Sequence, residues 1–308
     1  MSTALLFPGQ ASQKVGMGQD IFEQTALGKT YFGLANEIMG EDITALIFNG
    51  PEEKLRQTKY TQPAIYLVSV LLGELLLENG QDPDCAAGHS LGEYSALTIA
   101  GAFNFSTGFK LVKIRAEAMY QAGQNSPGTM AAVIGMDEAA VTDLCREASS
   151  GNEIVVPANF NSPGQIVISG TVPAVKKAIE IGREFGAKKI VLLNVSGAFH
   201  SPLMTPAREA LEKMLNEVEI QDVRFPVYAN VTAEPTISSD DIRTYLIEQL
   251  EQPVQWERTV KNMVQSGVSS FLEVGPGKVL QGLNRRIDRR VPMSGVETYQ
   301  EVMEIKHV

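Results

Sequence analysis

Cys85-Ala86-Ala87-Gly88-His89-Ser90-Leu91-Gly92 is a short apolar run that ends in the pattern G-x-S-x-G. The run is typical of a buried strand, and the residues that follow it, 93–102, favour a helix. A serine between two glycines at this junction predicts a tight strand-to-helix turn, in which a Cβ at either glycine would crowd the backbone. Such a turn exposes the Ser90 hydroxyl at a helix N-terminus, where free N–H groups can stabilise an oxyanion. The same pattern also arises by chance in a glycine-rich chain, so an ordinary turn is the alternative.

Outward from this turn, short apolar strands alternate with helices in both directions. This alternation predicts a mainly parallel sheet covered by helices on both faces, as in an α/β-hydrolase-like fold. A long, mostly helical region is expected between the first strand and about residue 80. The expected strands are 4–7, 85–88, 227–230 and 271–274, and the expected later helices are 93–102, 106–122, 203–218, 239–250 and 277–287.

Residues 128–196 have a different pattern. Strand-like runs at 129–134, 154–159, 165–169 and 189–195 are combined with two helices, for which Asp137 and Thr171 are the expected N-caps. The resulting order, βαββαβ, is that of the ferredoxin-like split motif. We therefore expect a large catalytic α/β subdomain from residues 1–127 and 197–308, with a small ferredoxin-like subdomain, 128–196, inserted into it.

Composition limits the possible functions. The chain has 308 residues and a formal net charge of −10, which argues against nonspecific binding to nucleic acid. The N-terminus has no signal-peptide pattern, and polar residues interrupt the longest apolar run, 64–77, so that it cannot span a bilayer. Two cysteines, Cys85 and Cys145, are typical of a reducing compartment. We expect a soluble, cytoplasmic protein with no membrane or nucleic-acid partner.

Metal and cofactor motifs are missing from the sequence. Three histidines and the lack of a CxxC pair predict no metal site. The segment 275–278, GPGK, matches neither glycine-rich nucleotide motif, so we interpret it as a strand-to-helix turn and expect no cofactor. Two basic runs, Lys188-Lys189 and the arginines of 284–290, are either solvated surface, the simpler interpretation, or docking sites for an anionic partner.

A serine needs a base to become a nucleophile, and histidine is the usual one near neutral pH. His89 is adjacent to Ser90, so its side chain should point away from the serine, and His307 is the penultimate residue. His200 follows the last strand of the small subdomain, at a loop-to-helix junction where α/β proteins place catalytic groups. His200 is therefore the candidate base, and a purely structural histidine is the alternative.

Arg115 falls on the apolar side of the expected helix 106–122. A guanidinium directed inward needs a carboxylate or a cage of hydrogen-bond acceptors, because an unpaired buried charge is very costly. Either an internal acid or the carboxylate of a substrate would satisfy it. Helical-wheel geometry alone favours the internal ion pair.

Together these segments resemble the malonyl-CoA:acyl carrier protein transacylase family, which loads fatty acid synthesis and is related to the acyltransferase domains of polyketide synthases. The resemblance runs through essentially the whole chain. It rests on Arg115 and on LFPGQ (6–10), YTQPA (60–64), GHSLGEY (88–94), NFNSPGQ (159–165), GAFHS (197–201), PVQW (253–256) and EVGPG (273–277). One departure is Ala11, where the family commonly has glycine.

The resemblance implies a role for each matching residue. Ser90 would accept the acyl group, and His200 would be its base, oriented by the main-chain carbonyl of Gln249 rather than by an acid. Backbone N–H groups of Gln10 and Leu91 would form the oxyanion hole.

The resemblance also implies how the acyl group is chosen. Arg115 would bind the free carboxylate of malonate, which reverses the preference drawn from the helical wheel. Gln62 would line the acyl pocket, and the bulk of Phe199 would crowd an α-methyl group and so favour malonyl over methylmalonyl.

The implied reaction transfers malonyl from malonyl-CoA to the phosphopantetheine thiol of acyl carrier protein, an acidic partner, through malonyl-Ser90. Three other functions stay open: a thioesterase or esterase on the same turn, a binding subunit without turnover, and a malonyl acyltransferase that serves a polyketide synthase in trans. Nothing in the sequence demands more than a monomer.

Overall fold

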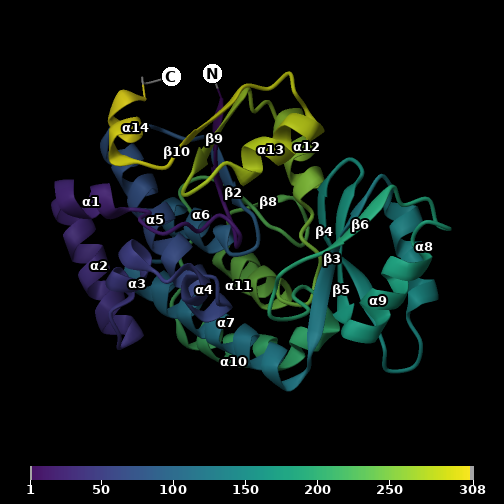
Figure 1. Ribbon diagram of the computed structural model, residues 1–308. Helices are drawn as coiled ribbons and strands as arrows, with labels where there is room; N and C mark the ends of the chain where they lie inside the picture. The colour runs from purple at the N-terminus through teal and green to yellow at the C-terminus, as the bar shows by residue number, and fades with distance from the viewer. Residues whose placement is uncertain (1, 306–308) are drawn as a thin grey trace.

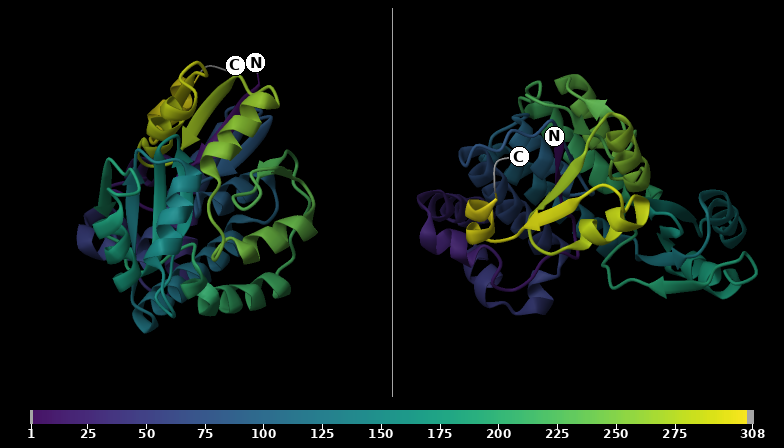
Figure 2. Two further views of the ribbon diagram at one scale, coloured as in Figure 1. Left: turned by 90° about the vertical axis from the view of Figure 1, so that its right-hand side faces the viewer. Right: turned by 90° about the horizontal axis from the view of Figure 1, so that it is seen from above.

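Two separate sheets organise the computed structural model, which describes residues 2–305 (Figure 1). One sheet has six strands in the order β10-β9-β1-β2-β7-β8, and the other has four in the order β4-β5-β3-β6. We call the six-stranded sheet and its helices the large subdomain, and the four-stranded sheet and its helices the small subdomain. The small subdomain lies at one side of the large one (Figure 2).

The large sheet is parallel except at one edge, which confirms the expected α/β architecture. Only the short β8 runs antiparallel, to its neighbour β7. The strand bounds are β1 Thr3–Phe7, β2 Cys85–Gly88, β7 Val227–Tyr228, β8 Pro235–Thr236, β9 Ser270–Val274 and β10 Met293–Val296. Register pairs Phe7 with Gly88, so the loops after β1 and β2 leave the sheet side by side.

Helices cover both faces of this sheet. Leu5 and Phe7 of β1 belong to one apolar core, whereas Ala4 and Leu6 belong to another that includes Trp256. Alternate side chains of a strand point to opposite faces, so each face of β1 is buried under helices. The helices are α1 Gln19–Gln24, α2 Ala26–Met39, α3 Ile43–Asn49, α4 Glu52–Leu55, α5 Thr58–Glu78, α6 Gly92–Ala100, α7 Phe105–Asn125, α10 Thr205–Glu217, α11 Ser239–Glu248, α12 Trp256–Gln265, α13 Val279–Ile287 and α14 Tyr299–Glu304, with a 3₁₀ turn, η1, at Pro202–Met204.

The helix α5 is apolar along most of its length. Among the described residues it alone is long and apolar enough to span a membrane, and 89% of its apolar window is buried inside the protein. It packs against α6 and α7. Its apolar composition is therefore that of a core helix.

The small subdomain has the strand order of the ferredoxin-like motif, as expected, and all of its pairings are antiparallel. Its two helices pack on one face of the sheet over a separate apolar core. Its elements are β3 Gly128–Ile134, α8 Glu138–Ala148, β4 Val155–Ser162, β5 Gln165–Thr171, α9 Val172–Ile181 and β6 Lys189–Leu192. The boundaries 127/128 and 196/197 stay our proposal.

The two expected caps of this subdomain differ. Asp137 accepts a hydrogen bond from the Ala140 N–H at the start of α8. Thr171 occupies the N-cap position of α9, as expected, but its hydroxyl makes no capping hydrogen bond. The expected side-chain cap is therefore wrong. In the large subdomain the sequence analysis also missed α12, β10 and α14.

The turn after β2 is packed as tightly as its two glycines predict. A Cβ on Gly88 would lie 1.8 Å from the carbonyl carbon of Gly92, and a Cβ on Gly92 would lie 2.0 Å from the Phe7 carbonyl oxygen. Both neighbours are backbone atoms that cannot move aside. These glycines therefore fix the position of Ser90 against β1.

We predict that Gly88→Ala lowers the free energy of unfolding by about 3 kcal/mol or more, because the added methyl overlaps backbone. Gly33→Ala is the matched control: Gly33 is exposed in α2, and a Cβ added there would meet no atom within 4 Å, so alanine should raise stability by up to about 1 kcal/mol. Urea unfolding of both variants measures the difference. Equal stability of the two would contradict this view of the turn.

Candidate active site

Ser90 and His200 meet although 110 positions separate them: Ser90 Oγ lies 2.8 Å from His200 Nε2. Ser90 comes from the turn between β2 and α6, and His200 comes from the loop before η1. Both residues have positive φ, 51° and 56°. Such backbone conformations are unfavourable for residues with a Cβ and are concentrated at functional sites.

The orientation of His200 is set by main-chain oxygens. Its Nδ1 lies 2.8 Å from the Gln249 carbonyl oxygen and 3.2 Å from that of Gln252. Because both oxygens can only accept, Nδ1 carries the proton and donates it, which leaves the Nε2 lone pair to accept from the Ser90 hydroxyl. Burial, with a further contribution from the charge of Arg115, lowers the pKa of His200 to about 3. The ring is neutral near pH 7 and able to take a proton.

Arg115 is fully buried on α7 and points at the serine. Its guanidinium donates to Gln62 Oε1 at 2.6 Å, to Gln249 Oε1 at 2.9 Å and to Ser90 Oγ at 3.0 Å. Within residues 2–305, no carboxylate lies within 4.0 Å of it. The internal ion pair favoured by the helical wheel is therefore wrong. The cation is held by neutral oxygens alone, and its Nε has no hydrogen-bond partner among the described residues.

Two backbone donors lie next to the serine. Over the described part of the chain, the N–H groups of Gln10 and Leu91 have no hydrogen-bond acceptor, whereas the N–H of Ser90 donates to Asn230 Oδ1 at 2.7 Å. Gln10 follows β1 and Leu91 opens α6, so the pairing of β1 with β2 brings them together. Unpartnered N–H groups at this position can stabilise an oxyanion.

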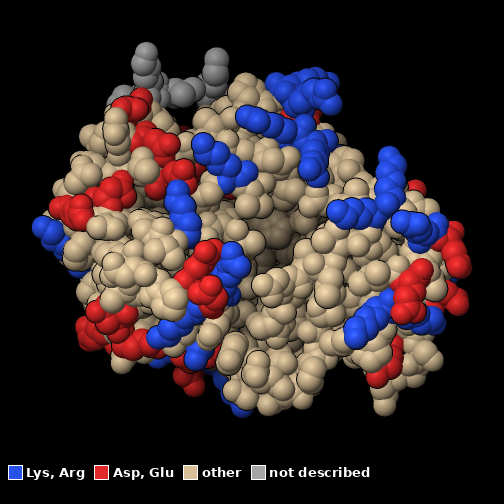
Figure 3. All heavy atoms as spheres, viewed as in Figure 1, with Lys and Arg blue, Asp and Glu red and all other residues tan. Residues whose placement is uncertain are grey.

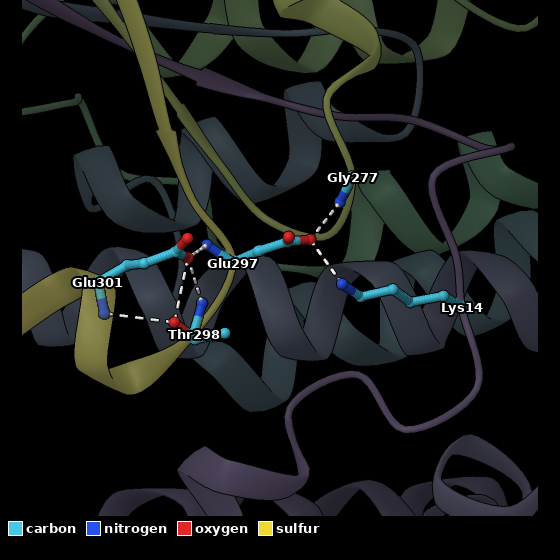
Figure 4. Close-up of polar contacts among 5 residues, drawn as sticks. All are labelled: Lys14, Gly277, Glu297, Thr298 and Glu301. Carbon is cyan, nitrogen blue, oxygen red and sulfur yellow. Dashed lines mark hydrogen bonds and ion pairs between the residues drawn. The ribbon is translucent and has the colours of Figure 1, made fainter.

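The loop that carries Gln10 is tied to the C-terminal part of the chain (Figure 4). Glu297 accepts from Lys14 Nζ at 2.7 Å and from the Gly277 N–H at 3.1 Å. Next to it, Thr298 and Glu301 form the capping box that starts α14. Glu297 thus joins the loop after β1 to the loop after β9.

Ser90 and His200 line a pocket of about 260 Å³ between the two subdomains. Figure 3 shows the surface hollowed at this place. Gln10, Gln62 and Phe199 also line it. Its remaining wall is mainly apolar and comes from both subdomains: Met119, Met130, Ala132, Val167, Leu193, Val195, Val279, Leu280 and Leu283.

His89, the other histidine among the described residues, is engaged away from the serine hydroxyl. His89 Nε2 lies 2.8 Å from Asn161 Oδ1, and its ring packs near that of Trp256. His307 lies outside the described residues. No cluster of His, Cys, Asp or Glu within residues 2–305 is arranged to hold a metal ion.

The comparisons with known proteins agree with this geometry. The model of the acyl transferase domain family matches residues 4–300. A malonyl CoA-acyl carrier protein transacylase of Bacillus subtilis (strain 168) is 44% identical over 94% of this chain and 91% of its own length. The chain belongs to the malonyl-CoA:acyl carrier protein transacylase family.

Solved structures extend the family likeness to the whole fold. An acyl carrier protein S-malonyltransferase from Vibrio cholerae O1 biovar eltor str. N16961 has a TM-score of 0.94 at 42% identity, covering 99% of this chain and 100% of that one. A malonyl-transacylase in complex with its type II polyketide synthase acyl-carrier protein has a TM-score of 0.93 at 39% identity, covering 98% of both chains.

Two polar residues near the family's serine motif were missed by the sequence analysis. Asn230 holds both sides of the turn, since its Oδ1 accepts from the Ser90 N–H and its Nδ2 donates to the Gly88 carbonyl oxygen at 2.6 Å. Glu93 is buried and accepts from Gln249 Nε2 at 2.6 Å and from the Asn230 N–H at 3.2 Å. The available signal was the acid directly after G-x-S-x-G, at the start of the helix expected over residues 93–102.

The lowered pKa of His200 predicts that the reactivity of Ser90 persists to a lower pH than an ordinary histidine would allow. Labelling of Ser90 by a fluorophosphonate needs neutral His200, so its rate should hold as the pH falls through 6.5 and decline only well below pH 5. The unfolded chain takes up a proton that the folded chain does not, so stability also falls from pH 6.5 toward pH 3. Labelling rates with circular dichroism at each pH separate the two effects. A rate that halves near pH 6.5 in folded protein would contradict this assignment.

Proposed function

We propose that this protein transfers the malonyl group of malonyl-CoA to the phosphopantetheine thiol of acyl carrier protein, and thereby supplies fatty acid chain elongation. The observation that carries the proposal is the buried Arg115, whose guanidinium lies 3.0 Å from Ser90 Oγ without a carboxylate partner among the described residues. A cation at this place recognises an acyl group with a second, free carboxylate. The malonyl transacylase relatives make malonyl the acyl group of choice.

In the first half-reaction Ser90 Oγ attacks the thioester carbonyl carbon while His200 Nε2 accepts the hydroxyl proton. The negative charge on the carbonyl oxygen is stabilised by the N–H groups of Gln10 and Leu91. The C–S bond then breaks, the CoA sulfur takes the proton from His200, and malonyl stays on Ser90 as an ester.

The second half-reaction uses the same groups in the opposite direction. The phosphopantetheine thiol gives its proton to His200 and attacks the ester carbonyl carbon. Ser90 leaves as an alkoxide and regains the proton from His200. No acid is needed behind the histidine, because the Gln249 carbonyl oxygen already fixes the ring.

Acyl selection follows from what surrounds the guanidinium. A malonyl carboxylate forms charge-assisted hydrogen bonds with Arg115, whereas an acetyl group leaves the buried cation without an anion. Gln62 holds the guanidinium through a nitrogen other than the one that faces Ser90. Phe199 lines the pocket next to His200 and limits substitution at the α-carbon.

Mass spectrometry after addition of malonyl-CoA tests the proposal. A transferase gives a malonyl ester on Ser90 that persists and is discharged by acyl carrier protein with its phosphopantetheine arm, while Ser90→Ala gives none. A thioesterase on the same turn would release free malonate rapidly without the carrier protein. A binding subunit would give no ester in either case.

We predict that Arg115→Ala lowers malonyl transfer by roughly 100-fold, the equivalent of losing a charge-assisted hydrogen bond in a buried site. Acetyl transfer should improve relative to malonyl transfer. Lys110→Ala is the matched control, because Lys110 is an exposed cation on the same helix. The ratio of kcat/KM for the two acyl-CoA thioesters is the measurement, and an unchanged ratio would refute the role of Arg115.

Docking of acyl carrier protein requires positive potential at the pocket mouth, because carrier proteins of this family are acidic and this chain has a net charge of −10. Figure 3 shows basic side chains on both sides of the hollow, over α13 and over the small subdomain. Exposed residues at these places are Lys188, Lys189, Arg285, Arg286, Arg289 and Arg290. We assign the docking surface to them and propose that the protein acts as a cytoplasmic monomer, without a nucleic-acid or membrane partner.

Charge reversal tests this surface. We expect Arg285→Glu with Arg286→Glu, or Lys188→Glu with Lys189→Glu, to raise KM for the carrier protein several-fold more than KM for malonyl-CoA. Lys29→Glu on α2 is the control, since it adds the same kind of charge far from the pocket. Equal effects on both substrates would count against the assignment.

A further inference from the structure

A buried polar network of Glu93, Asn230 and Gln249 contacts the serine turn. Glu93 is 3% exposed on α6, three positions after Ser90. Its Oε2 accepts from Gln249 Nε2 at 2.6 Å and from the Asn230 N–H at 3.2 Å. The Glu93 carboxyl group takes part in no step of the proposed reaction. A single residue, Gln249, nevertheless connects it to Arg115 by hydrogen bonds.

That intervening residue, Gln249, has a side-chain amide with two unlike ends. Its Oε1 accepts from Arg115 at 2.9 Å, and its Nε2 donates both to Glu93 and, at 3.0 Å, to the Ser90 carbonyl oxygen. If the amide were reversed, its NH₂ would face the guanidinium and two donors would oppose each other. The acceptor oxygens of Glu93 and of the Ser90 carbonyl group therefore both favour the orientation in which the amide oxygen faces Arg115, and the Glu93 contact is the shorter of the two.

We propose that Glu93 is a positioning residue for acyl selection: it holds the Gln249 amide so that its oxygen, with that of Gln62, keeps the Arg115 guanidinium directed at the substrate carboxylate. The inference rests on the proposed malonyl transfer and deepens it. Glu93 stabilises the cation through an amide rather than by direct contact. The guanidinium is thus held beside Ser90 by neutral oxygens, and no carboxylate among the described residues competes with a substrate anion for it.

The position of the Glu93 oxygen matters more than its charge. Burial raises the pKa of Glu93 to about 7, although the hydrogen bond from Gln249 partly opposes the shift. Near neutral pH the group therefore exists in both protonation states, and each state offers Gln249 an acceptor oxygen. A purely structural role, through the Asn230 N–H, would lower stability but would not distinguish malonyl from acetyl.

Two variants separate the effect of the position of the Glu93 oxygen from the effect of its charge. Glu93→Gln keeps an acceptor oxygen at the same reach and removes the charge, whereas Glu93→Asp keeps the charge and withdraws the carboxylate from Gln249 by one methylene. The measurement is kcat and KM for Ser90 acylation by malonyl-CoA and by acetyl-CoA, with urea unfolding of each variant. Glu74→Ala, which removes a partly buried carboxylate from α5, is the control for stability alone.

We expect Glu93→Gln to keep the malonyl-to-acetyl ratio of kcat/KM within about threefold of the unchanged protein. Glu93→Asp should lower the ratio roughly tenfold, mainly through a higher KM for malonyl-CoA, as expected when a buried hydrogen bond is lost. An unchanged ratio in Glu93→Asp, or a larger loss in Glu93→Gln than in Glu93→Asp, would overturn the proposal.

The controls also separate this inference from the proposed function. If the unchanged protein forms no malonyl ester, or Arg115→Ala keeps its selectivity, the proposed function fails first. If malonyl is selected through Arg115 and the ratio is still unchanged in Glu93→Asp, only the role of Glu93 fails. Should Glu93→Asp not fold, Glu93→Ala, in which the acceptor is absent, must lower the ratio at least as much.

Discussion

The hydrogen bond between Ser90 Oγ and His200 Nε2 is the interaction on which the rest of the site depends. Its two partners reach it by different routes: one through a strand of the large sheet, the other through the loop that returns from the small subdomain. The packing of Gly88 and Gly92 fixes the first partner, and the Gln249 carbonyl oxygen fixes the second. Neither constraint involves a carboxylate, so in the reaction that we propose a neutral imidazole with a fixed orientation activates the serine.

Burial also underlies the second property that we propose for the site, which is selectivity for a charged acyl group. Arg115 is fully buried, and its partners among the described residues are all neutral. A substrate anion should therefore bind this guanidinium more strongly than it would bind an arginine on the surface. The same lack of solvent keeps His200 neutral beside a cation. The proposed reactivity and the proposed selection therefore share one physical origin, the burial of His200 and Arg115.

The sequence predicted those features that depend on local geometry. The strand at 85–88, the turn at Ser90 and the Asp137 cap are each specified by a few neighbouring residues. The partners of Arg115 could not be predicted from its helix, because Gln62 and Gln249 come from other elements and from far along the chain. Family resemblance supplied its orientation instead. Glu93 and Asn230 were missed for the same reason, since each acts only through contacts that the folded chain creates.

The division of the pocket between two sheets has a consequence for how such an enzyme changes its substrate. Ser90 and His200 are held by the large subdomain, whereas Met130, Val167 and Leu193 form a wall that belongs to the small one. Substitutions along that wall can widen or narrow the space for the acyl chain without disturbing the reacting atoms. Part of the space for the acyl chain can therefore change by mutation in the small subdomain, while the residues that react stay as they are.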